Sequence, residues 1–224
     1  MKWNELIDAV GAEPVFETGL LLVGDVNRDD VTRQLCRWVQ SGKLLQLRRG
    51  LYSFAGSHSL ARRTLSPDEI ANRLVPGSYV SLTSVLGRAG LIPEYVPVTT
   101  SITTGRPQRC VTPLGTFVYR HVKPAMFWGF EAVVVGPGVR VFTAVPEKAL
   151  IDLLYLEPDS AHPAYLSELR IQNLDRLSFD LLASMAARCE MKRVIHSVSE
   201  IAAMAADEAE SYRPWTSAKE DELS

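Results

Sequence analysis

Eight side chains between residues 28 and 49 have the types and spacing needed to bind nucleic acid. Arginine and glutamine can read base edges in the major groove, and arginine and lysine neutralise phosphates. The set consists of Arg28, Thr32, Arg33, Arg37, Gln40, Lys43, Arg48 and Arg49. It predicts a duplex DNA interface, with base reading by Arg33 and Arg37 and phosphate binding by Arg48 and Arg49.

The sequence indicates a catalytic site less clearly than it indicates a DNA interface. Glu131 and the pair Glu147-Lys148 could be assigned to a nuclease-like carboxylate-lysine set. Their spacing, and the place of Glu147 at the start of a helix, argue against it. The stretch 136–138 lacks the third glycine of a dinucleotide fingerprint, and no phosphate-binding loop is present. We therefore expect no enzymatic activity and no cofactor.

The predicted DNA-binding side chains need a helix to hold them. An apolar stripe at helical spacing is formed by Val31, Leu35, Trp38 and Val39. The basic and polar residues fall on the opposite side of that helix. Asn27 can cap its start, and the residues 41–42, Ser-Gly, end it after roughly four turns. The pattern is typical of a helix with one buried face.

A hairpin is predicted directly after this helix. Residues 43–47 and 51–54 are strand-like, and Arg48-Arg49-Gly50 joins them with a glycine suited to a tight turn. Upstream, the apolar spacing within residues 3–10 predicts a first helix, and residues 17–23 a second, short helix buried under the third. Helix, short helix, longer helix and two-stranded hairpin form the winged variant of helix-turn-helix.

A second region of mixed structure follows a polar linker at residues 55–59. Ser66 and the proline after it predict a helix to about residue 74, and residues 79–88 predict another. Four strand-like runs between residues 96 and 142 predict a small, mainly antiparallel sheet. Further helices are expected at residues 146–155, 178–187 and 192–206. The fold class is therefore α+β.

Composition and charge support two functional regions. The 224 residues are 46% hydrophobic and 22% charged, which is typical of a globular protein. The net charge is −2, yet residues 25–63 carry eight lysines and arginines against three aspartates. We predict a winged-helix domain at residues 1–57, an α+β domain at 64–210 and a flexible tail at 211–224. The first residues resemble no signal peptide and no run could span a bilayer, so we expect a cytoplasmic protein.

The three cysteines, Cys36, Cys110 and Cys189, are odd in number and far apart in the sequence. This spacing favours reduced thiols over a disulfide framework or a zinc site. We therefore expect no bound metal.

Three segments in order along the chain resemble AbiEi-type antitoxins of type IV toxin-antitoxin systems. They are residues 41–52 with Ser-Gly-Lys-Leu and Arg-Arg-Gly-Leu-Tyr, residues 79–91 with Tyr-Val-Ser-Leu-Thr-Ser, and residues 146–152 with Pro-Glu-Lys-Ala-Leu-Ile-Asp. The resemblance covers about residues 1–210. It implies a winged helix that represses its own promoter at inverted repeats, and a second domain that neutralises a nucleotidyltransferase-like toxin in phage defence. It supplies no catalytic residues.

Two other functions stay open. The chain could be a stand-alone winged-helix repressor whose second domain binds a ligand or another subunit, with a dimer on DNA. Alternatively, the winged helix could target a nucleic-acid-processing enzyme. A toxin gene beside this one would favour the antitoxin, and metal-dependent turnover of nucleic acid would favour the enzyme.

Overall fold

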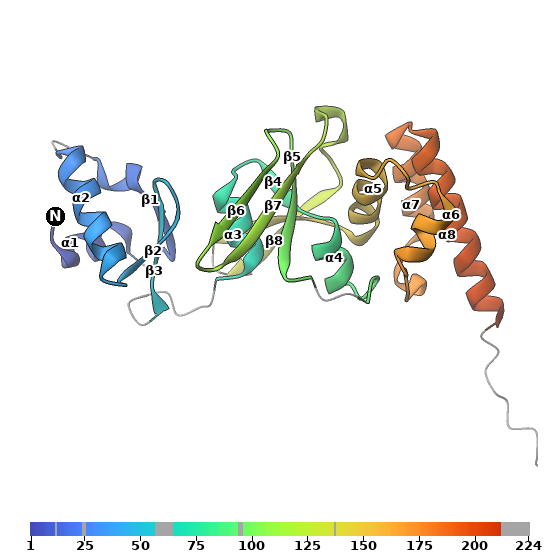
Figure 1. Cartoon of the computed structure of the whole chain (residues 1–224), viewed down its shortest axis with the longest axis horizontal. Coiled ribbons are helices and arrows are strands. Elements are labelled where there is room, and N and C mark those ends of the chain that lie inside the picture. The colour runs from blue at the N-terminus through green and yellow to red at the C-terminus, as the bar shows by residue number, and fades with distance from the viewer. Residues whose placement is uncertain (12, 24–25, 57–64, 94–95, 137, 212–224) are drawn as a thin grey trace, which may run out of the picture.

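The computed structural model describes residues 1–11, 13–23, 26–56, 65–93, 96–136 and 138–211. These residues form a mixed α+β protein with sheets of three and six strands. The N-terminal elements lie at one end of an elongated molecule, the larger sheet lies in the middle, and the last helices lie at the other end (Figure 1). The predicted tail at 211–224 lies outside the described residues except for Ser211, and so does most of the predicted linker.

The first region is a small sheet covered by two helices. Its elements are α1 Trp3–Val10, β1 Val15–Glu17, the 3-10 helix η1 Thr18–Leu21, α2 Arg28–Gln40, β2 Leu44–Arg48 and β3 Leu51–Phe54. The strand order is β1-β3-β2, with both pairs antiparallel. As predicted, Asn27 caps α2, since its side chain accepts the backbone N–H groups of Asp29 and Asp30. Gly50 has a positive φ of 80° in the predicted turn.

The prediction of a short second helix at residues 17–23 is wrong. Residues 15–17 pair with β3 as a strand, and only the next four residues coil, as a 3-10 helix. Leu21 is buried in the cluster that contains Val31 and Leu35 of α2, whereas Leu20 and Val23 are exposed, so the segment is buried only in part. Pairing with β3 outweighs the local helical signal at the start of this segment, where Glu17 lies opposite Leu51 and the N–H of Thr18 donates to the carbonyl of Gly50 at 2.9 Å.

An aromatic cluster joins the helices of the first region to its sheet. Trp3 packs edge-on against Trp38 at 5.1 Å and against Phe54 at 5.8 Å between ring centroids. Leu6 and Leu35 are fully buried beside them. This burial fixes which face of α2 points inward, and therefore which face is left outside.

The second region is built on a six-stranded sheet. Its strands are β4 Ser78–Val80, β5 Val98–Thr103, β6 Gln108–Thr112, β7 Gly115–His121, β8 Phe130–Gly136 and β9 Val139–Ala144, in the order β6-β7-β5-β4-β9-β8. Three pairs are antiparallel, while β4–β9 and β5–β7 are parallel. The four predicted strand runs are confirmed as β5, β7, β8 and β9. The sheet is larger and more mixed than the sequence predicted.

Two strands of this sheet were not predicted. The residues 79–88 were expected to be one helix, but Tyr79 and Val80 belong to β4 and the helix α4 is shorter, Thr83–Arg88. Strand β6 is absent from the four predicted strand runs. Strand β4 forms through pairing with β5, about 20 residues further along the chain, which a local pattern does not reveal, whereas β6 forms a tight hairpin with β7, the strand that follows it.

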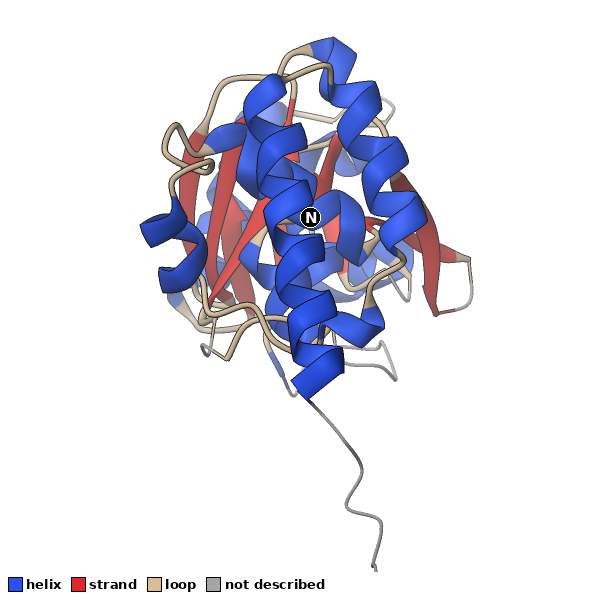
Figure 2. Ribbon diagram, turned by 90° about the vertical axis from the view of Figure 1, so that its right-hand side faces the viewer, coloured by secondary structure: helices blue, strands red, loops and turns tan. Residues whose placement is uncertain are grey.

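Helices pack around the sheet and at one end of it. They are α3 Pro67–Leu74, α5 Pro146–Leu156, α6 Pro163–Glu168, α7 Phe179–Cys189 and α8 Lys192–Ser211, with short 3-10 turns η3 Pro124–Met126 and η4 Leu174–Arg176. Figure 2 shows helices in front of the strands when the molecule is viewed from the end that carries α7 and α8. The predicted capping residue Ser66 accepts the N–H of Glu69, at the start of α3. Within the described ranges, no helix combines the length and the apolar character that a bilayer crossing requires.

The two regions contact each other through the hairpin and α3. Val15, Leu47 and Leu51 of the first region pack into the main hydrophobic cluster of the second. An ion pair of 3.2 Å joins Arg73 of α3 to Glu13. Strand β2 also lies next to β6, so an edge strand of one sheet faces an edge strand of the other.

Candidate nucleic-acid interface

Helix α2 presents a polar face to solvent. Val31, Leu35 and Trp38 are buried as predicted. The outward face consists of exposed Arg28, Thr32, Arg33, Cys36, Arg37 and Gln40. The side chains predicted to read bases are therefore on the accessible side of the helix.

Several of these side chains already have partners within the helix. Arg33 forms an ion pair of 3.2 Å with Asp30, and both side chains are well exposed. The Thr32 hydroxyl donates to the carbonyl of Arg28 at 2.9 Å. Exposed ion pairs contribute about 0–1 kcal/mol, so phosphate or a base edge can replace Asp30 at small cost. Asp29 and Asp30 are favourable at the positive end of the helix, but they repel phosphate there.

The three basic residues of the hairpin segment differ in their surroundings. Lys43 lies with its ammonium 5.1 Å from the centre of the Trp3 ring, a cation–π contact. Arg49 is exposed at the turn. Arg48 points toward the second region, where its Nε donates to the carbonyl of Leu74 at 3.1 Å and its Nη2 to Glu17 at 3.0 Å.

Arg48 and Arg49 are thus not an equivalent pair at a free hairpin tip. The third guanidinium nitrogen of Arg48 donates to the carbonyl of Arg49 at 3.3 Å, so each nitrogen of the group has an internal acceptor. Binding of Arg48 to phosphate requires at least one of these contacts to break. Arg49 is the basic side chain of this turn that can contact DNA without a rearrangement.

A buried polar network in the second region was not anticipated from the sequence. The Lys148 ammonium donates to Asp152 and to the carbonyl of Met126, and the second carboxylate oxygen of Asp152 accepts from Tyr79 at 2.9 Å and Ser81 at 2.7 Å. Lys148 and Asp152 are fully buried. The ammonium also lies 4.2 Å from the centre of the Trp128 ring. The network ties α5 to β4.

Burial sets the protonation behaviour of this network. It raises the pKa of Asp152 and lowers the pKa of Lys148, and the attraction between the two opposes both changes. It also raises the pKa of Tyr79, with the Asp152 charge adding to the effect. With three hydrogen-bonded partners and no exposure of either charge, the pair is suited to fixing helix α5 in place rather than to exchanging protons with a substrate.

The sequence-based candidates for catalysis are not assembled into a centre. Glu131 is exposed on β8, whereas the carboxylate of buried Glu147 accepts the backbone N–H of Ser178 at 2.8 Å, at the start of α7. The sharp turn from β4 into α4 does hold a strained residue with a positive φ of 61°, a geometry that exposes a nucleophile in hydrolases, but here it is buried Leu82. Among the described side chains, no group of His, Cys, Asp and Glu could hold a metal ion.

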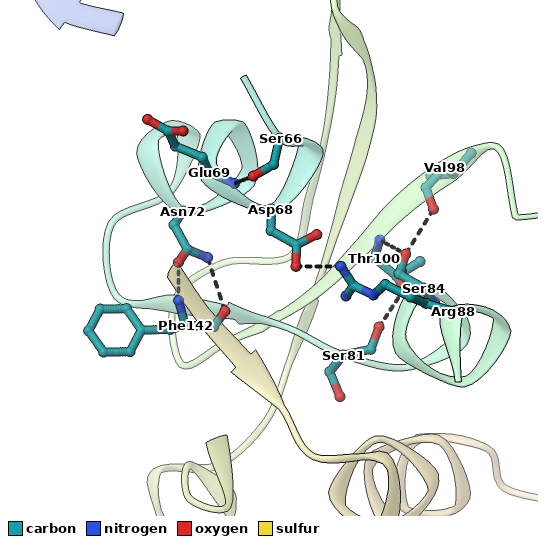
Figure 3. Close-up of polar contacts among 10 residues, drawn as sticks. All are labelled: Ser66, Asp68, Glu69, Asn72, Ser81, Ser84, Arg88, Val98, Thr100 and Phe142. Atoms are coloured by element: carbon teal, nitrogen blue, oxygen red, sulfur yellow. Dashed lines mark hydrogen bonds and ion pairs between the residues drawn. The ribbon is translucent and has the colours of Figure 1, made fainter. Parts of the chain in front are cut away.

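Polar side chains gather where α3, α4 and β5 meet (Figure 3). This junction borders an open cavity. Arg88 reaches the carboxylate of Asp68 at 2.7 Å, and the Ser84 and Thr100 side chains are hydrogen-bonded to each other. On the other side of α3, Asn72 bonds both backbone groups of Phe142. The cavity, of about 460 Å³, is lined by Asp68, Ser84 and Arg88 together with apolar residues including Ile92 and Val98.

The sequence was also compared with known families and with curated proteins. No family model matches it, and no curated protein matches it.

Proposed function

We propose that the chain is a DNA-binding antitoxin and autorepressor of a type IV toxin-antitoxin system, with residues 1–57 as a winged helix-turn-helix. In this role α2 enters the major groove of promoter repeats, and the β2–β3 hairpin is the wing. Residues 64–210 neutralise a nucleotidyltransferase-like toxin encoded beside this gene. The antitoxin part of the proposal rests on the family resemblance of three sequence segments.

One observation carries the DNA-binding part. Helix α2 buries Val31, Leu35 and Trp38 and leaves Arg33, Arg37 and Gln40 together on its exposed face. A major groove admits an α-helix, and arginine or glutamine on that helix can form paired hydrogen bonds with guanine or adenine. Exposed Arg49 on the following turn is placed on the same small domain, where it can hold phosphate.

Fluorescence anisotropy with the full chain and duplexes covering its own promoter tests this. We expect affinity that falls with salt, because bound arginines and lysines release counterions. Arg33→Ala should lower affinity for the preferred site by about 1–3 kcal/mol and relax sequence preference. Arg170→Ala removes an exposed arginine of the second region and serves as the matched control. Absence of salt-sensitive duplex binding by the wild-type chain would remove the DNA-binding proposal.

The cavity beside Asp68 and Arg88 favours a second candidate function, a repressor controlled by a small ligand. It combines an apolar lining with a few polar groups, as ligand pockets do. In that case a bound metabolite should raise the melting temperature and change DNA affinity, and Arg88→Ala should abolish both effects. Rescue of growth from a co-expressed neighbouring toxin separates the antitoxin from this alternative.

A further inference from the structure

The two edges of the six-stranded sheet are protected differently. An edge strand exposes unpaired N–H and C=O groups, and soluble proteins normally cover such a strand or place charges on it. Edge strand β6 lies beside β2 and carries exposed Arg109. Edge strand β8 has one charged side chain, Glu131, followed by the exposed apolar run Ala132–Val135.

This apolar surface extends over both faces of β8. Val133 is 41% exposed, Val134 66% and Val135 37%, and these neighbours alternate between the faces along the regular part of the strand. On β9, Phe142 lies opposite Ala132 and is 44% exposed. A contiguous exposed apolar surface of this kind is typical of an interaction site.

We propose that β8 is the interface of a homodimer, in which the β8 strands of two copies pair antiparallel about a two-fold axis at Val133. Val133 is the midpoint of the strand Phe130–Gly136. The pairing places Val133 of each copy opposite its equivalent, and Ala132 opposite Val134 of the second copy. The two six-stranded sheets then continue into one another.

Charge and side-chain pattern favour a second copy as the occupant. In this register Glu131 faces Val135 of the second copy, so no like charges oppose each other, and every other cross-strand contact between residues 131 and 135 is apolar. Within one copy Val133 lies opposite Val141 of β9. Pairing of the two Val133 residues therefore places four valines side by side across the interface. The irregularity between Val134 and Gly136 lies near one end of the strand and leaves its centre regular.

The same patch on both partners is what a closed two-fold interface requires, so the strand needs no other protein to complete it. The dimer does not depend on DNA binding. Where the proposed function holds, its two-fold axis also matches the symmetry of an inverted repeat, because each half-site then meets one α2 helix.

Analytical ultracentrifugation of the full chain without DNA tests the proposal. The wild-type protein should form a dimer, and Val133→Lys and Val133→Glu should each be monomeric, because like charges then meet at the axis. An equal mixture of the two variants should form a heterodimer. Val111→Lys is the matched control: Val111 is 72% exposed on the other edge strand, β6, and this variant should stay dimeric.

Three results would overturn the interface: a monomeric wild-type chain, a Val133→Lys variant that dimerises as well as Val111→Lys, or variants that do not associate when mixed. If Val133→Lys fails to fold by circular dichroism, hydrogen exchange on the wild-type protein decides. The β8 amides should then exchange more slowly as protein concentration rises, and unchanged exchange would reject the proposal. Failure of DNA binding with an intact dimer counts against the proposed function alone.

Discussion

The guanidinium of Arg48 donates to the backbone carbonyl of Leu74, at the last residue of α3. This contact joins the hairpin of the first region to a helix of the second. The adjacent ion pair also joins the two regions, between Arg73 of α3 and Glu13, which precedes β1. The position of the hairpin is therefore coupled to α3. If DNA binds at the hairpin, as proposed, this contact couples DNA binding to any event that moves α3.

Arg48→Ala and Arg49→Ala should have different effects. Arg49→Ala should weaken binding to all duplexes by a similar factor and lower the salt dependence, because it removes a phosphate contact. Arg48→Ala should mainly loosen the contact between the regions, so that limited proteolysis separates the first region from the second faster than in the wild type. Anisotropy at two salt concentrations and timed proteolysis measure both. Equal loss of DNA affinity in the two variants, with unchanged proteolysis, would show that Arg48 acts as a phosphate ligand.

Asp152→Asn should strongly destabilise the protein. The substitution leaves the buried Lys148 ammonium without its counter-ion, and removing one partner of a buried pair costs about 3–5 kcal/mol. Adding Lys148→Met should recover part of this loss, since no unpaired charge then stays buried. Asp159→Asn, at an exposed position, is the control and should change the free energy of unfolding little. Urea denaturation measures all four proteins; a stable Asp152→Asn variant would mean that the pair is not ionised.

Stability should fall as the pH rises above the ordinary tyrosine pKa of 10.0. Burial, aided by the Glu157 charge, raises the pKa of Tyr165 to about 12, and burial raises the pKa values of Tyr79 and Tyr119 as well. Between these values the unfolded chain has released protons that the folded chain still holds, which favours unfolding. Denaturation at several alkaline pH values, with phenolate absorbance, measures this. Tyr165→Phe should lower the pH dependence, and an unchanged slope would contradict the assignment.

Repression and neutralisation should be separable in the full chain. The variant Arg33→Ala/Arg37→Ala/Arg49→Ala should lose promoter repression, yet it should still rescue growth when a constitutive promoter supplies it together with the neighbouring toxin. Intact protein is preferable to fragments here, because Leu47 and Leu51 of the first region pack into the core of the second. If this variant is present at normal levels and rescue fails, the assignment of neutralisation to residues 64–210 must be withdrawn.

Local signals in the sequence predicted the elements that depend on local chemistry. Asn27 and Ser66 cap helices as predicted, and the Arg-Arg-Gly turn forms a hairpin. Strand β4 was not predicted because it depends on partners elsewhere in the chain, β5 and β9, and β6 was not predicted because of its own composition, although its partner β7 follows directly. Tyr79 and Val80 precede a true helix, and residues 108–112 are too polar to indicate a strand.

The candidate site was predictable in part for the same reason. The exposed face of α2 follows from helical periodicity. The inward orientation of Arg48 depends on the carbonyl of Leu74, which lies 26 residues away. Lys148 and Asp152 have the i, i+4 spacing of an ordinary solvated ion pair, so their burial was missed. The available signal was their surroundings, since the residues between and after them, Ala149, Leu150, Ile151, Leu153 and Leu154, leave α5 without a polar face.

The network between α5 and β4 also bears on the order in which the chain can fold during synthesis. Strand β4 lies near residue 80, but its neighbour β9 and the Lys148–Asp152 pair that holds Tyr79 and Ser81 emerge from the ribosome much later. Until residue 152 is available, β4 lacks one strand partner and its buried hydroxyl groups lack their acceptor. The first region can close its local helix and hairpin contacts early, while the second must wait as a loosely packed chain. The second region therefore exposes most apolar surface and unpaired strand while it is still being synthesised, and a chaperone would act mainly at that stage.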